Sequence, residues 1–150
     1  TIHFYKNWYS GQLQPFHTIM SQIEKASPRT FLKNIIGNMF MLVPLSFLLM
    51  LLNDKYKNIL KQTIIILPTI ILIEVLQAFT YTGTFDVDDI ILNYIGTVIF
   101  IILLEKTKLI DKIKPLFYKD FKLKNKTKYH TLYITLTILI CFIAITLLKL

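Results

Sequence analysis

Four long apolar runs separated by charged loops limit what this chain can fold into. They cover residues 35–52, 63–79, 89–104 and 132–148, and each approaches the ~20 residues that a helix needs to cross a bilayer. A soluble bundle of such helices would have too little polar face to stay in water. The runs predict an all-α fold: a polytopic membrane helix bundle with about four transmembrane helices.

A short amphipathic helix is predicted before the first run. Its apolar residues recur at helical spacing, at Phe16, Ile19, Met20 and Ile23. Pro15 suits the first turn of such a helix, and Ser27-Pro28 should end it. We expect this segment to be an interfacial helix at the membrane surface.

Lysines gather in two loops and are missing from a third. Residues 105–130 hold nine lysines and residues 53–62 hold three, whereas residues 80–88 carry only acidic charges. The positive-inside rule puts the two lysine-rich loops in the cytoplasm and the acidic loop outside. This predicts a multi-pass protein of a plasma membrane. It also puts residues 1–33 outside, for which a further span upstream of Thr1 is expected; residues 1–11 show no signal-peptide pattern.

The longer basic loop has an apolar stripe of its own. Its residues at 109, 110, 113, 116 and 117 are apolar and follow helical spacing. A basic amphipathic segment beside a span is typical of contact with anionic inner-leaflet headgroups, so membrane lipid is the expected partner of residues 105–130. A simple solvated loop is the alternative, and no motif supports nucleic-acid binding.

Polar side chains interrupt the first three runs near their outer ends. Glu74 and Gln77 lie one helical turn apart in the second run, and Asp86, Asp88 and Asp89 lead into the third, which carries Asn93; Asn34 and Asn38 open the first. Charged groups inside a membrane are costly and usually face a polar interior. With the orientation above, these groups fall in one outer-leaflet layer.

Two further features of the spans bear on packing. Pro44 and Pro68 each remove a backbone hydrogen bond and favour a kink. Gly37, beside the two asparagines, is expected to let another helix approach closely.

The polar layer has two interpretations. Asn and Gln can simply join membrane helices by hydrogen bonds, and Asp can cap helix starts. Alternatively, carboxylates gathered in one low-dielectric layer raise a pKa or demand a cation. On the third span Asp86, Asp89, Asn93 and Gly96 share one helix face, which favours a common site.

An ordered set of short motifs resembles the VanZ-like family of bacterial membrane proteins, named for a member linked to teicoplanin resistance. The set comprises Gln14-Pro15-Phe16, Asn34-x-x-Gly37-Asn38, Pro44, Glu74-x-x-Gln77, Thr82-Gly83, residues 85–89 and Asn93-x-x-Gly96. It implies one membrane domain over residues 1–150, with the resemblance strongest over 12–104, a basic cytoplasmic loop at 105–130 and a last span in 131–150. Many members have an arginine where this chain has Thr84.

The resemblance implies a polar ligand pocket made by Asn34, Asn38, Glu74, Gln77, Asp86, Asp89 and Asn93. The expected function is binding of a lipid-linked cell-wall component, or glycopeptide (teicoplanin-type) resistance, in the cell envelope and without a cofactor. The alternative is a metal-assisted membrane enzyme acting on a phosphate-bearing lipid. Mg²⁺ or another divalent cation would then be held by Glu74, Asp86, Asp88 and Asp89. A structural subunit whose polar layer only joins helices is the third possibility, so whether the protein is an enzyme stays open.

Overall fold

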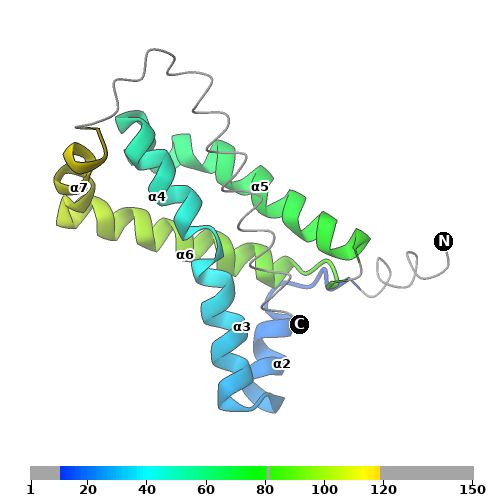
Figure 1. Cartoon of the computed structure of the whole chain (residues 1–150). Coiled ribbons are helices and arrows are strands. Elements are labelled where there is room, and N and C mark those ends of the chain that lie inside the picture. Colours follow the sequence, from blue (N-terminus) through cyan, green and yellow to red (C-terminus); the bar gives the residue numbers. More distant parts are fainter. Residues whose placement is uncertain (1–10, 81, 119–150) are drawn as a thin grey trace.

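The structure is a computed structural model that describes residues 11–80 and 82–118, and within them every regular element is a helix (Figure 1). The elements are α2 (His17–Lys25), α3 (Pro28–Met41), α4 (Val43–Leu52), the short 3₁₀ helix η1 (Asp54–Lys57), α5 (Ile59–Phe79), α6 (Val87–Thr107) and α7 (Leu109–Tyr118). The predicted fourth span at 132–148 lies outside the described residues.

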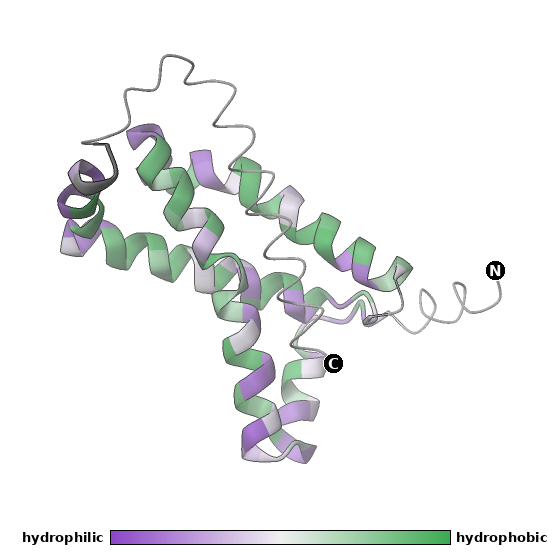
Figure 2. Cartoon of the chain, in the orientation of Figure 1, coloured by the Kyte–Doolittle hydropathy of each residue, from purple (hydrophilic) through white to green (hydrophobic). Residues whose placement is uncertain are grey.

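Three stretches are long and apolar enough to cross a membrane: Pro28–Leu52, Ile59–Phe79 and Val87–Thr107. Figure 2 shows their middle turns as mostly hydrophobic, with polar residues gathered toward helix ends and on the lower part of α3. These helices coincide with the first three predicted runs, which confirms a membrane-type all-α architecture. Each helix also extends beyond its apolar run, because hydropathy marks the lipid-facing length and not the capped ends.

The first span is bent between α3 and α4 (Figure 1). Leu42 interrupts the helix with φ −100° and ψ 5°, and Pro44 follows in the first turn of α4. Proline has no N–H to donate and its ring crowds the preceding turn, whereas it fits a helix start. The predicted break near Pro44 is therefore confirmed. Around Pro68, by contrast, α5 runs from Ile59 to Phe79 as one helix.

The tightest helix crossing lies between α3 and α6. A Cβ atom added to Gly96 would lie 2.1 Å from the carbonyl oxygen of Met39, so only glycine lets the two backbones approach this far. Gly37 does not have the predicted role, because a Cβ built there would meet nothing within 4 Å. It lies one position before Asn38 on α3 and faces away from the crossing.

Two apolar clusters fill the bundle between its ends. The first joins α4 and α5 through Leu42, Leu45, Leu49, Ile66, Ile70 and Ile73. The second joins α4, α6 and α7 through Met50, Leu51, Ile101, Leu104 and Ile110. The first part of the predicted apolar stripe of α7 therefore packs on other helices, since Ile110 is buried and Ile113 packs beside it.

Two spans, α5 and α6, run between two chemically different ends of the bundle, and α4 also reaches one of these ends. We call the end formed by η1, the last turn of α6 and the start of α7 the lysine end, and the end formed by the last turns of α5, residues 82–86 and the first turns of α6 the acidic end. Both lysine-rich segments meet at the lysine end, because Lys57 of η1 pairs with Asp111 of α7 at 2.5 Å. This is the separation of charge that the orientation argument requires.

A small ion network holds η1 against α7 at the lysine end. Asp54 lies 3.1 Å from Lys57 and 2.8 Å from Lys114. Hydrogen bonds from Lys114 and then Lys57 lower the pKa of Asp54 below its ordinary 3.8. The hydrogen bond to Asp111, and then the bond to Asp54, raise the pKa of Lys57 above its ordinary 10.5, against the lowering effect of burial.

We predict that this network contributes a constant, small stability across neutral pH. A lowered carboxyl pKa stabilises the fold above the unfolded pKa, and that contribution is lost as pH falls through the folded value, below 3.8. Asp54→Asn should lower the unfolding midpoint in detergent slightly, since exposed pairs contribute roughly 0.2–1 kcal/mol. The deficit should vanish in acid below 3.8. A deficit that changes between about pH 5 and 8, well above the lowered pKa of Asp54, would contradict this account.

Candidate functional site

The start of α6 is capped by its own sequence. Asp86 is the N-cap residue, with extended backbone angles, and its Oδ1 accepts a hydrogen bond from the N–H of Asp88 at 2.9 Å. Asp88 and Asp89 occupy the first turn, where negative charge interacts favourably with the helix dipole. The acidic run therefore has a local structural role, and its side chains are fixed where α6 begins.

Glu74 connects the end of α5 to this cap. Its side chain is fully buried, and its Oε2 accepts a hydrogen bond from the backbone N–H of Asp86 at 3.4 Å. Gln77, one turn later, is also fully buried, and its backbone carbonyl oxygen accepts from the N–H of Thr82 at 3.2 Å. The predicted convergence of Glu74 with the acidic run is thus present in the fold.

Asn38 and Asn93 bring the first and third spans into the same cluster. The Asn38 side-chain amide donates to Oδ1 of Asp89, so α3 is tied to α6 just before the crossing at Gly96. Asn93 is fully buried, and its Nδ2 donates to the carbonyl oxygen of Asp89 at 2.7 Å. This bond fixes which amide atom is nitrogen, because a carbonyl can only accept.

The amide oxygen of Asn93 is a buried hydrogen-bond acceptor inside the cluster. Among the residues that the structure describes, Oδ1 of Asn93 is buried and has no hydrogen-bond donor within reach. A buried acceptor without a partner costs about 1–3 kcal/mol. An incoming N–H, O–H or water would remove that cost.

Asp88 binds a segment from the other end of the chain. It is fully buried, and its two carboxylate oxygens accept the backbone N–H groups of Phe16 at 2.5 Å and Ile19 at 3.0 Å. These donors lie at the start of α2, whose N-cap Phe16 has no side-chain cap and a left-handed φ of 66°. Pro15 therefore lies before the helix, and not in its first turn as predicted. Gln12 completes the attachment by pairing with Phe85 and Val87 through backbone bonds of 2.8 and 3.0 Å.

This arrangement coincides with the region of the chain that known proteins share. The profile of the family described as VanZ/LLP1 matches residues 2–110, which include every element from α2 to α6. The chain belongs to the VanZ/LLP1 family. No curated protein and no solved structure gives a significant match.

Six of the seven predicted pocket residues of this VanZ/LLP1 protein belong to the cluster, and the acidic end is built from them. They are Asn38, Glu74, Gln77, Asp86, Asp89 and Asn93. Asn34 is half-buried one turn before Asn38, and no side-chain hydrogen bond joins it to residues 11–80 or 82–118. Thr84 is exposed.

The cluster of this VanZ/LLP1 chain does not present a ready set of metal ligands. Within residues 11–80 and 82–118, no three Asp, Glu, His or Cys side chains are gathered as a metal ion would require. The reason is visible in the bonding: Asp88 accepts two backbone amides, Asp86 accepts one, and Asp89 accepts the Asn38 amide. The carboxylates are engaged by different elements and point to different partners.

Proposed function

We propose that this VanZ/LLP1 protein binds a lipid-linked cell-wall intermediate, or the lipid-bearing part of a teicoplanin-type glycopeptide, at its acidic end. The observation that carries the proposal is the burial of charged and amide side chains from three spans in one layer. Glu74 and Gln77 of α5 and Asp88 and Asn93 of α6 are fully buried there, and Asn38 of α3 is 8% exposed. Such groups are costly in a membrane and usually mark a ligand or ion path.

The chemistry of the layer selects the ligand class. Carboxylate and amide oxygens accept hydrogen bonds, so they favour N–H, O–H and ammonium groups. Peptide and sugar portions of cell-wall intermediates and of glycopeptides present such groups. Phosphate does not suit the layer, because like charges repel at close range; a lipid phosphate would lie outside the acidic side chains.

An apolar surface for the lipid chain adjoins the acidic end on α5. Leu72, Leu76 and Phe79 are 50%, 37% and 52% exposed, close in sequence to Glu74 and Gln77. In a membrane this surface faces lipid, where an acyl or isoprenoid chain could lie without extra cost. The headgroup would then reach the polar layer from the side of the bundle.

The test is Glu74→Gln, which keeps the shape and the acceptor toward Asp86 but removes the charge. We expect labelled teicoplanin, or a purified lipid-linked disaccharide–peptide precursor, to bind the purified variant about tenfold more weakly, the loss typical of one charge-assisted hydrogen bond. Glu24→Gln, an exposed change on α2, is the matched control and should bind as the wild type does.

Cell measurements distinguish the proposed roles. Expression of the wild type should lower sensitivity to teicoplanin, and Glu74→Gln should reduce that protection. Equal sensitivity with and without the protein would count against the resistance form of the proposal. A Glu74→Gln protein that still binds the precursor, but no longer converts it, would favour the metal-assisted enzyme instead.

A further inference from the structure

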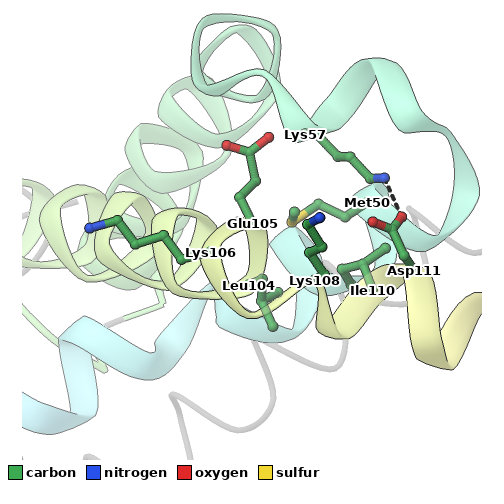
Figure 3. Close-up of a pocket in the computed structure, with 8 residues that line it drawn as sticks. All are labelled: Met50, Lys57, Leu104, Glu105, Lys106, Lys108, Ile110 and Asp111. Atoms are coloured by element: carbon green, nitrogen blue, oxygen red, sulfur yellow. Dashed lines mark hydrogen bonds and ion pairs between the residues drawn. The ribbon is translucent and has the colours of Figure 1, made fainter.

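A second candidate site lies at the lysine end, remote from the cluster discussed above. A cavity of about 380 Å³ opens between α4, η1, α6 and α7 (Figure 3). It is lined by Met50, Lys57, Leu104, Glu105, Lys106, Lys108, Ile110 and Asp111. Its volume falls in the range of about 300–1,000 Å³ that small-molecule sites occupy.

The charges around this cavity are unequal. The residues that line it include three lysines (Lys57, Lys106 and Lys108) and two acidic residues (Glu105 and Asp111). Asp111 is paired with Lys57 at 2.5 Å, and Asp54 with Lys57 and Lys114. Of the lining residues, Asp111 is therefore paired with Lys57, and two lysines remain against Glu105. The lining keeps a formal charge of +1 (three lysines minus two acids), which attracts anions.

Lys108 is the lysine best placed to contact an anion bound in the cavity. In Figure 3 its side chain lies beside Met50 and toward the Lys57–Asp111 pair, whereas Lys106 extends away along α6. Among the ion pairs of the described residues, none involves Lys108. A lysine ammonium supplies three donors and a compact positive charge, which suits phosphate oxygens.

The backbone at Lys108 adds an independent observation. Lys108 is the C-cap of α6 and has a left-handed φ of 50°. Positions of this kind at helix ends are usually glycine or asparagine, because a Cβ atom is disfavoured there. Folding alone would favour glycine or asparagine here. The lysine at this position is therefore better explained by what its side chain binds.

The cavity also has an apolar side that continues toward the membrane. Leu104 and Ile110 are buried in its wall, while the neighbouring Ile102, Leu103 and Leu109 are 37%, 54% and 40% exposed. A ligand with a charged head and a hydrocarbon chain could place its head against the lysines and its chain against the exposed apolar residues. A small soluble anion would use only the lysine side.

We propose that this cavity binds the phosphate group of an anionic phospholipid, with Lys108 as the direct contact and Lys57 as a second cation held in place by Asp111. Basic pockets beside the ends of membrane helices bind anionic headgroups by such contacts. The site is distinct from the acidic end and holds whether or not the function proposed above is correct.

The experiment follows the thermal unfolding of the full chain in uncharged detergent with short-chain lipids. We expect dioctanoyl phosphatidylglycerol to raise the unfolding midpoint saturably, and dioctanoyl phosphatidylcholine to leave it unchanged, because binding to the native state stabilises it. Lys108→Gln should weaken the phosphatidylglycerol affinity about tenfold. Lys61→Gln removes the same charge from an exposed position outside the cavity and should keep the wild-type affinity.

A second variant separates binding from folding. Lys108→Gly accepts the left-handed backbone more readily, so its midpoint without lipid should equal or exceed that of the wild type, while its phosphatidylglycerol affinity falls as in Lys108→Gln. Equal shifts from both lipids, or a wild-type lipid response in both Lys108 variants, would overturn the proposal. A saturable, Lys108-dependent shift from inorganic phosphate alone would overturn the lipid assignment and identify a soluble phosphate compound instead.

Discussion

Gly96→Ala should disrupt the crossing of α3 over α6 and lower the yield of folded protein sharply. The added Cβ would lie 2.1 Å from the oxygen, 2.5 Å from the Cα and 2.6 Å from the carbonyl carbon of Met39. All three are backbone atoms, so no side chain can rotate aside and α3 itself must move. Overpacking typically costs about 1–3 kcal/mol, and the displacement of α3 would also strain the bond between Asn38 and Asp89. The unfolding midpoint in detergent measures the effect.

Gly37→Ala is the matched control for this substitution. The same atom is added to a glycine in the same pair of helices, but at a position with nothing within 4 Å. We expect little change in the midpoint, or a slight rise, because alanine is the better helix former by about 1 kcal/mol. If the two variants unfold alike, close backbone contact at Gly96 is not what holds α3 against α6.

The choice between these glycines shows where sequence reasoning stops. Gly96 shares a helix face with Asp89 and Asn93 in the sequence, and Gly37 adjoins Asn38. Spacing identifies the face of a helix but not the partner that packs on it. The sequence predicts the close approach of two helices at Gly37. The structure has it at Gly96, where the backbone of Met39 on α3 packs against α6.

The convergence at the acidic end could be predicted because depth follows from simple geometry. Helices that alternate in direction bring the end of α5 and the start of α6 to one side, and the rise per residue places Glu74 close to that side. The bond between Glu74 and the Asp86 N–H agrees with this. The individual hydrogen bonds could not be predicted, because they depend on side-chain rotamers and on how α3 is bent at Leu42.

The role of Asp88 was missed, although a signal for it exists. Asp88 lies off the face shared by Asp86, Asp89 and Asn93, and the sequence predicts it only as a member of the acidic run and as a candidate metal ligand. The sequence before α2 reads Gln14-Pro15-Phe16 and lacks a Ser, Thr, Asp or Asn at the N-cap position. A helix start without a local cap needs acceptors from elsewhere, and Asp88 supplies them.

Asp88→Ala should release α2 from the start of α6. The change removes both acceptors of the Phe16 and Ile19 N–H groups. Each partly buried donor left without a partner costs about 1–3 kcal/mol, and the loss of negative charge at the α2 N-terminus adds about 0.3–1 kcal/mol. The population with α2 detached should therefore rise at least about tenfold, for which 1.4 kcal/mol suffices. Hydrogen exchange at residues 16–19 measures this opening.

The effect of Asp88→Ala on hydrogen exchange should be confined to α2 and should not extend to the whole bundle. Exchange should accelerate in α2, while the amides of α5 and the middle of α6 stay protected, because the cap of α6 is formed by Asp86 and survives the change. Glu24→Ala removes an acidic side chain from the exposed face of α2 and should leave exchange at residues 16–19 unchanged. Slow exchange at those residues in Asp88→Ala would mean that the backbone pairing of Gln12 with Phe85 and Val87 is enough to hold α2. Asp88 would then not be needed to hold α2, although its carboxylate accepts the Phe16 and Ile19 N–H groups.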